Sequence, residues 1–97
     1  MPVDPELLRR ARDCPQDLRF GEACKLAEQL GFEEVRTRGS HNVFRHPMAS
    51  SIRAAFPLPL NLQCGQDGKA KAYQVRQMIQ MAEALGVLSV RKEDAND

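Results

Sequence analysis

The residues from 38 to 47, RGSHNVFRHP, hold the side chains best suited to chemistry in this chain. Gly39 supplies the backbone freedom of a tight turn, and Ser40 can hydrogen-bond locally to hold it. His41 follows the turn and opens an extended run. Because an imidazole changes protonation near neutral pH, His41 is a candidate general base. The sequence therefore predicts a histidine at a strand start, beside a flexible turn, with arginines nearby at positions 36, 38 and 45.

The face on which His41 lies is left open by the sequence. Successive side chains of a strand point to opposite sides of a sheet, so His41 shares a side with Val43, and Phe44 shares a side with His46. If Phe44 packs inward, His41 lies on the outer face, and if Val43 is the buried residue the assignment reverses. In both cases His41 and His46 lie on opposite faces.

Charge is distributed unevenly along the 97 residues, although the formal net charge is only +1. Residues 1–35 carry five Lys and Arg against eight Asp and Glu, residues 36–92 carry nine against two, and the last five residues are acidic. Phosphates are bound by local patches, so the basic central segment keeps nucleic acid open as a partner. Scattered solvated charge is the alternative interpretation.

Periodicity predicts three helices and three strands around this run. Asp4-Pro5-Glu6 indicates a helix start, and this short first helix should end before Pro15. A second helix is expected from about 21 to 30, closed by Gly31, and a third from about 70 to 85, closed by Gly86. Residues 33–38 and 41–46 form a predicted hairpin, and a third strand lies within 52–63, at an edge because of its prolines.

This order predicts an α+β fold, in which a three-stranded antiparallel sheet carries its helices on one face. The α-β-β-β-α part is the layout of double-stranded-RNA-binding domains, and an extra N-terminal helix precedes it. We expect one domain over residues 1–97, with an accessory helix at 1–17, a core at 18–88 and a flexible acidic tail at 89–97.

Three motifs between Phe20 and Gln77 resemble the HicA family of type II toxin–antitoxin toxins, which are small mRNA interferases. The first is LGFEEVR at 30–36, and the second is RGSHNVFRHP at 38–47. The third is NLQ at 61–63 followed by GKAKAYQVRQM at 68–78. Together they occur in order and at the family's separations.

The resemblance implies a double-stranded-RNA-binding-like fold, a catalytic histidine at His41 and neutralisation by a HicB-type antitoxin that covers the site. Two departures accompany it. Asn42 occupies the position of the family's second histidine, and the loop from Met48 to Phe56 is longer than is usual in the family.

A ribonuclease of this kind needs a base for the 2′-hydroxyl of RNA and donors for the charge that develops on the phosphate. His41 is the predicted base. The candidate RNA contacts are Arg38, Gly39, Ser40, Lys69, Lys71 and Arg76. Lys69 and Lys71 lie at the N-terminal end of the last helix, where the dipole disfavours cations, so contact with an anion would explain them. Tyr73 and Gln74 are further candidates to face RNA, with a cover over the sheet edge as the alternative for Tyr73, and the general acid is not identified.

The remaining expectations concern compartment and cofactors. Cys14, Cys24 and Cys64 are widely spaced and odd in number, which argues against a disulfide framework and for the cytoplasm. Cys24 is expected to be a small core residue. The sequence shows no membrane span, and its cysteines and histidines lack the spacing of metal ligands, so no metal or cofactor is expected.

Overall fold

The computed structural model describes residues 2–39, 41–47 and 59–89. The elements in order are α1 (Pro5–Asp13), η1 (Pro15–Asp17), α2 (Phe20–Gln29), β1 (Glu33–Arg38), β2 (His41–Arg45), β3 (Leu60–Gln63) and α3 (Ala72–Ala84). The sheet is antiparallel in the order β1-β2-β3. The predicted α+β fold is therefore confirmed, including the edge position of β3.

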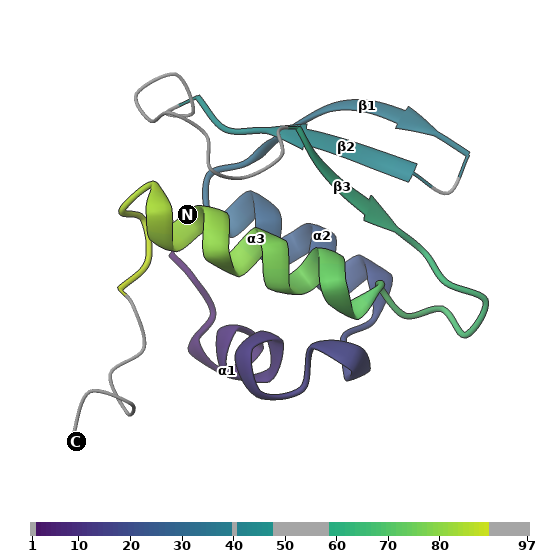
Figure 1. Cartoon of the computed structure of the whole chain (residues 1–97), viewed down its shortest axis with the longest axis horizontal. Helices are drawn as coiled ribbons and strands as arrows, with labels where there is room; N and C mark the ends of the chain where they lie inside the picture. Colours follow the sequence, from purple (N-terminus) through teal and green to yellow (C-terminus); the bar gives the residue numbers. More distant parts are fainter. Residues whose placement is uncertain (1, 40, 48–58, 90–97) are drawn as a thin grey trace.

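The helices lie on one side of the sheet in two layers (Figure 1). Helices α2 and α3 pack beneath the strands, and α1 packs on α2 and α3 from the far side. None of the described helices lies on the opposite face of the sheet (Figure 1). We call this uncovered side the open face.

Local signals in the sequence set the helix ends. The Asp4 carboxylate accepts hydrogen bonds from the backbone of Glu6 and Leu7, which caps α1 as predicted. Gly31 ends α2 with φ +96°, where the N–H of Phe32 donates to the carbonyl of Ala27. Gly86 ends α3 in the same way, so both predicted glycine closures are confirmed.

The core lies between the sheet and the two inner helices. Its largest fully buried side chains come from β2, β3, α2, α3 and the segment before α2: Leu18, Leu26, Phe44, Leu60, Leu62, Val75, Met78 and Met81. Cys24, which was expected in the core, is only partly buried, as is Phe20, and Leu26 is the large fully buried side chain of α2. The burial of this apolar surface is what fixes the sheet on the helices.

Some expectations concern residues that are not described. The first part of the predicted third strand falls outside the described ranges, as do the loop from Met48 to Phe56 and nearly all of the acidic tail. The division of the chain at residues 17 and 88 stays a prediction.

Candidate functional site

His41 lies on the open face of the sheet and is exposed. Phe44, whose side chain points to the opposite side of the strand from His41, is 0% exposed and belongs to the core beneath the sheet. Val43 is also buried, at 8% exposed, but it is outside the core cluster and faces the same side as His41. Phe44 therefore decides the question that the sequence left open, and His41 points away from the helices.

A chain of amide hydrogen bonds holds the His41 ring. Gln74, in the first turn of α3, is 3% exposed, and its Oε1 accepts from the backbone N–H of Gln63 at 2.7 Å. Its Nε2 donates to Oε1 of Gln63 at 3.1 Å. The Nε2 of Gln63 then faces Nε2 of His41 at 3.1 Å. Three elements of the fold thus converge on one imidazole.

This chain also determines which ring nitrogen carries the proton. A backbone N–H can only donate, so the Gln74 atom that it meets must be the oxygen. The orientation of the Gln63 amide follows, with its NH₂ directed at His41. Because an amide nitrogen does not accept, Nε2 of His41 accepts and the neutral ring carries its proton on Nδ1.

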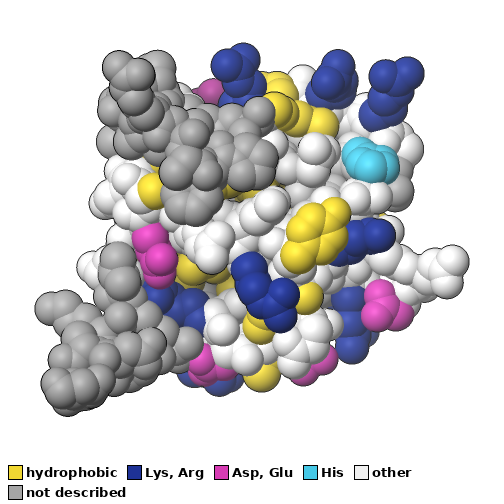
Figure 2. Space-filling model, in the orientation of Figure 1, with side chains coloured by type: hydrophobic (Ala, Val, Ile, Leu, Met, Phe, Trp, Pro, Cys, Tyr) yellow, Lys and Arg dark blue, Asp and Glu magenta, His cyan; other side chains and the backbone are white. Residues whose placement is uncertain are grey.

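Arginines surround His41 on the open face. Arg38 is the strand partner of His41, and Arg36 is the partner of Val43. Arg36, Arg38, His41, Val43 and Asn61 line a shallow hollow. Figure 2 shows basic side chains along the sheet side of the molecule, with a histidine ring beside them. An anion placed against His41 would therefore meet guanidinium groups.

A β-bulge in β1 keeps an acidic residue away from these arginines. The pairing changes register between Glu34, opposite Phe44, and Arg36, opposite Val43, so Val35 is the extra residue. Without the bulge, Glu34 and Arg36 would share a face. With it, the Glu34 carboxylate lies on the other side, where Asn42 donates to it at 2.9 Å and the Thr37 hydroxyl also contacts it.

The turn before His41 is only partly described. Gly39 has φ +60° and is exposed, with open space where a Cβ would be. Arg38 pairs with His41 across the turn, as the predicted hairpin requires. Ser40, which was predicted to contact RNA, lies outside the described residues.

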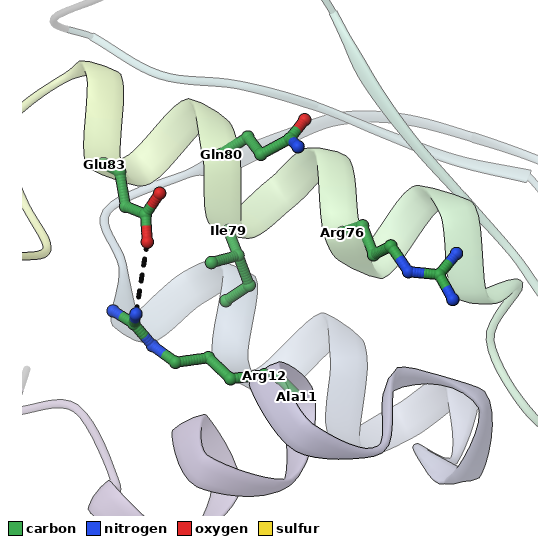
Figure 3. A pocket seen from close by; sticks show the side chains of 6 residues that line it. All are labelled: Ala11, Arg12, Arg76, Ile79, Gln80 and Glu83. Carbon is green, nitrogen blue, oxygen red and sulfur yellow. Dashed lines mark hydrogen bonds and ion pairs between the residues drawn. The ribbon is translucent and has the colours of Figure 1, made fainter. Parts of the chain in front are cut away.

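The other three predicted contacts are spread over the helix side. Lys69 makes an ion pair with Asp17 of η1 at 3.6 Å. Lys71 is exposed at the N-cap of α3, one turn before Gln74. Arg76 lies on the face of α3 that is turned toward α1, beside a hollow that is bordered by the ion pair of Arg12 with Glu83 (Figure 3). Of the six predicted contacts, the described structure brings Arg38 and Gly39 next to His41.

His46 is buried on the helix side of the sheet, where it stabilises the fold. It is 6% exposed, its Nε2 lies 3.0 Å from the carbonyl oxygen of Leu30, and its ring meets Phe32 edge-to-face at 5.0 Å. A Cβ added at Gly31 would approach this ring nitrogen to 2.7 Å, so the glycine makes room for it. Strand parity predicted that His46 and His41 lie on opposite faces, and this is confirmed.

The cysteines are all free in this structure. Burial raises the pKa of the Cys24 thiol to about 11, which fits the expected packing role and an unreactive thiol. Within the described ranges, no three His, Cys, Asp or Glu residues gather as metal ligands would. No described helix has the length and apolar character needed to cross a bilayer.

Sequence reasoning missed the roles of Gln63 and Gln74. Gln63 is part of the NLQ motif, and the sequence indicates for Gln74 only that it faces RNA. Glutamine near the end of an edge strand and in the first turn of a helix carries no pattern that predicts their contact. The one available signal was a polar residue beside Val75 on the buried side of α3.

The fold and this site define a class: an α+β domain like double-stranded-RNA-binding domains, with a histidine and arginines on the open face of its sheet. Residues 20–59 match the family model described as HicA toxin of bacterial toxin–antitoxin systems. The matched segment is less than half of the chain and runs from α2 to the residue before β3. No curated protein and no solved structure matched the chain. The resemblance to the HicA toxins is confirmed over the segment that contains His41.

Proposed function

We propose that this toxin is an endoribonuclease that cleaves mRNA without a metal ion, with His41 as the general base. The observation that carries the proposal is the exposed ring of His41, held by Gln63 through an unprotonated Nε2 and flanked by Arg36 and Arg38. This combination offers a proton acceptor beside a cationic surface, which is what cleavage of a phosphodiester requires.

The reaction uses a nucleophile that RNA itself supplies. Nε2 of His41 takes the proton of a 2′-hydroxyl, whose donor position is occupied in the free protein by the amide of Gln63. The 2′ oxygen forms a bond to the adjacent phosphorus, and the bond from phosphorus to the 5′ oxygen breaks. That 5′ oxygen takes a proton from water, and the hydroxide that remains takes up the proton that His41 accepted. The products are a 2′,3′-cyclic phosphate and a 5′-hydroxyl. Arg38 stabilises the charge on the phosphate.

Asn42 does not argue against this role. Its side chain donates to Glu34 on the helix side of the sheet, away from His41. Asparagine at the position of the family's second histidine therefore removes no group from the surface on which His41 lies. We propose that the activity persists, that it operates in the cytoplasm, and that a HicB-type antitoxin covers the open face to suppress it.

The test is incubation of the purified protein with a long RNA in the presence of EDTA. We expect cleavage with cyclic-phosphate ends, no cleavage by His41→Ala, and none at a position whose nucleotide carries a 2′-deoxyribose. Cleavage that survives either change would overturn the proposal. RNA that is bound but intact would indicate a non-catalytic RNA-binding module, and no effect on RNA would indicate a protein-interaction domain of the same fold.

A further inference from the structure

The open face of the sheet carries cationic side chains that no described residue neutralises through an ion pair. Arg36, Arg38 and Arg45 are exposed, and the described residues provide no ion pair for any of them. All three extend from the hairpin on the side away from the core. These guanidinium groups stay in contact with water, so the fold does not bear the cost of desolvating them. They can therefore bind anions from outside the protein.

These arginines line a continuous path. One hollow is lined by Arg36, Val43 and His41 among others, and a second by Arg36, Val43 and Arg45 with Val35 and Pro59. The two hollows share Arg36 and Val43 and so run along the outer side of β2. Four residue steps of a strand span about 13 Å, roughly four phosphate steps of a stacked nucleic-acid strand.

Acidic groups mark the limits of this path. The bulge at Val35 places Glu34 on the helix side, so the surface between Arg36 and His41 has no carboxylate among the described residues. Glu33 lies opposite Arg45 in the sheet. The most positive part of the path is therefore its His41 end, and the charge declines toward Arg45.

An exposed aromatic side chain lies at the His41 end. Tyr73 is 54% exposed, and its hydroxyl accepts from Nε2 of Gln74 at 3.3 Å. Gln74 is joined to Gln63, which contacts His41, so three hydrogen bonds connect Tyr73 with the imidazole. A nucleic-acid base can stack on an exposed aromatic ring, and such stacking does not depend on the nucleotide sequence.

We infer that an unpaired RNA strand binds along the open face of the sheet, with its phosphates on Arg36, Arg38 and Arg45 and a base near the cleaved bond stacked on Tyr73. The inference rests on the proposed function and adds the substrate class and its path. An unpaired strand fits because its bases are free to stack, whereas a duplex keeps them paired. In-line attack by the 2′-hydroxyl also needs backbone freedom that a stacked duplex restricts.

The test measures RNA binding in the His41→Ala background, which prevents cleavage. The probe is a fluorescently labelled single-stranded RNA of mixed sequence, titrated at several salt concentrations and compared with a duplex of the same length. Arg36→Gln and Arg45→Gln test the path. Arg76→Gln tests the helix side, and Arg9→Gln, on the exposed side of α1, is the matched control.

We expect each open-face variant to weaken single-strand binding and to reduce the slope of log K against log salt by about 0.7, the value for one lost phosphate contact. Arg9→Gln should leave both unchanged. Tyr73→Ala should weaken binding about tenfold, and Tyr73→Phe should retain it. Tighter binding of the duplex, or an equal loss in Arg76→Gln, would overturn the inference in favour of the helix side.

The two proposals fail separately. If wild-type protein cleaves RNA through His41 but the Arg36 and Arg45 variants bind RNA normally, the path is wrong and the nuclease stands. If the path binds RNA as expected but wild type leaves RNA intact, the nuclease is wrong. If these arginines affect only the binding of an antitoxin protein, the open face is a protein interface and the inference is overturned.

Discussion

The arginines of α1 and those of the hairpin differ in what they contact. Arg9 pairs with Glu6 and Asp13, Arg10 with Glu22, and Arg12 with Glu83. Arg36, Arg38 and Arg45 have no such partners among the described residues. The same residue type therefore forms ion pairs within and between helices on one side of the molecule and presents free charge on the other.

The two histidines repeat this difference. His46 is buried under the sheet against Phe32 and the end of α2, and His41 is exposed above it. Only one residue type is involved, so the difference comes from the face on which each ring lies. The open face is available for binding and chemistry, and the helix side stabilises the fold.

The largest expected effect is that of His41→Ala on catalysis. Loss of a general base should lower the cleavage rate about 10²- to 10⁴-fold. Because the ring is exposed, the free energy of unfolding should change little. Single-turnover cleavage and urea denaturation measure the two quantities, and a large loss of stability would place His41 with the structural residues.

His46→Ala should have the opposite profile. Removing a buried ring leaves a cavity and takes the hydrogen-bond partner of the Leu30 carbonyl away, at a cost of about 2–4 kcal/mol of unfolding free energy. His46→Phe, which keeps the ring, should recover part of this. Cleavage per folded molecule, measured at low temperature, should stay near wild type, and a loss of activity without a loss of stability would contradict the comparison.

Gln63→Glu tests the amide that holds His41. A carboxylate still accepts from Gln74, but it offers an acceptor instead of a donor to Nε2 of His41 and so stabilises the protonated ring. The protonated His41 ring then loses its proton, and can act as a base, only at higher pH. We expect about tenfold slower cleavage at neutral pH and an optimum moved upward.

The protonation of the His41 ring can also be observed directly, which provides the control for this substitution. Nitrogen NMR should show the proton on Nδ1 in wild type and on Nε2 in Gln63→Glu, with an unchanged midpoint of urea unfolding. An unaltered pH profile would mean that Gln63 does not control the protonation of His41.

The smallest effect concerns the ion pair between α1 and α2. The Glu22 carboxylate accepts hydrogen bonds from the Arg10 side chain and from the Arg19 backbone. These bonds, the first having the larger effect, hold the pKa of Glu22 below its ordinary value of 4.5. A lowered pKa in the folded state contributes stability above the unfolded value, and this stability is lost as pH falls through the folded value. Glu22→Gln should therefore lose a little stability at pH 7 and show a flatter decline below about pH 4.5, relative to the exposed control Glu28→Gln. Identical acid unfolding curves would show that the pair contributes nothing.

Much of the local structure could be predicted from the sequence. Asp4, Gly31 and Gly86 mark helix ends because capping and left-handed backbone depend on residues next to one another. The position of His41 at a strand start, and its separation from His46 by parity, follow from the two-residue repeat of a strand. Whether His41 is catalytic stays a prediction.

Other features depended on contacts between distant segments. The bulge at Val35 moved Glu34 away from Arg36, although simple alternation puts them on one face. Gln63 and Gln74 met because β3 packs on α3, and Lys69 came to lie beside Asp17 although the two are far apart in sequence.

The sequence by itself thus determined the elements, their ends and the direction in which His41 and His46 diverge, because these follow from backbone geometry over a few residues. Only the tertiary structure decided that Phe44 faces the core, that no described carboxylate pairs with the hairpin arginines and that an amide chain holds His41. Those outcomes depend on how a whole apolar core packs and on where a single extra residue enters the sheet, and neither is encoded in a local pattern.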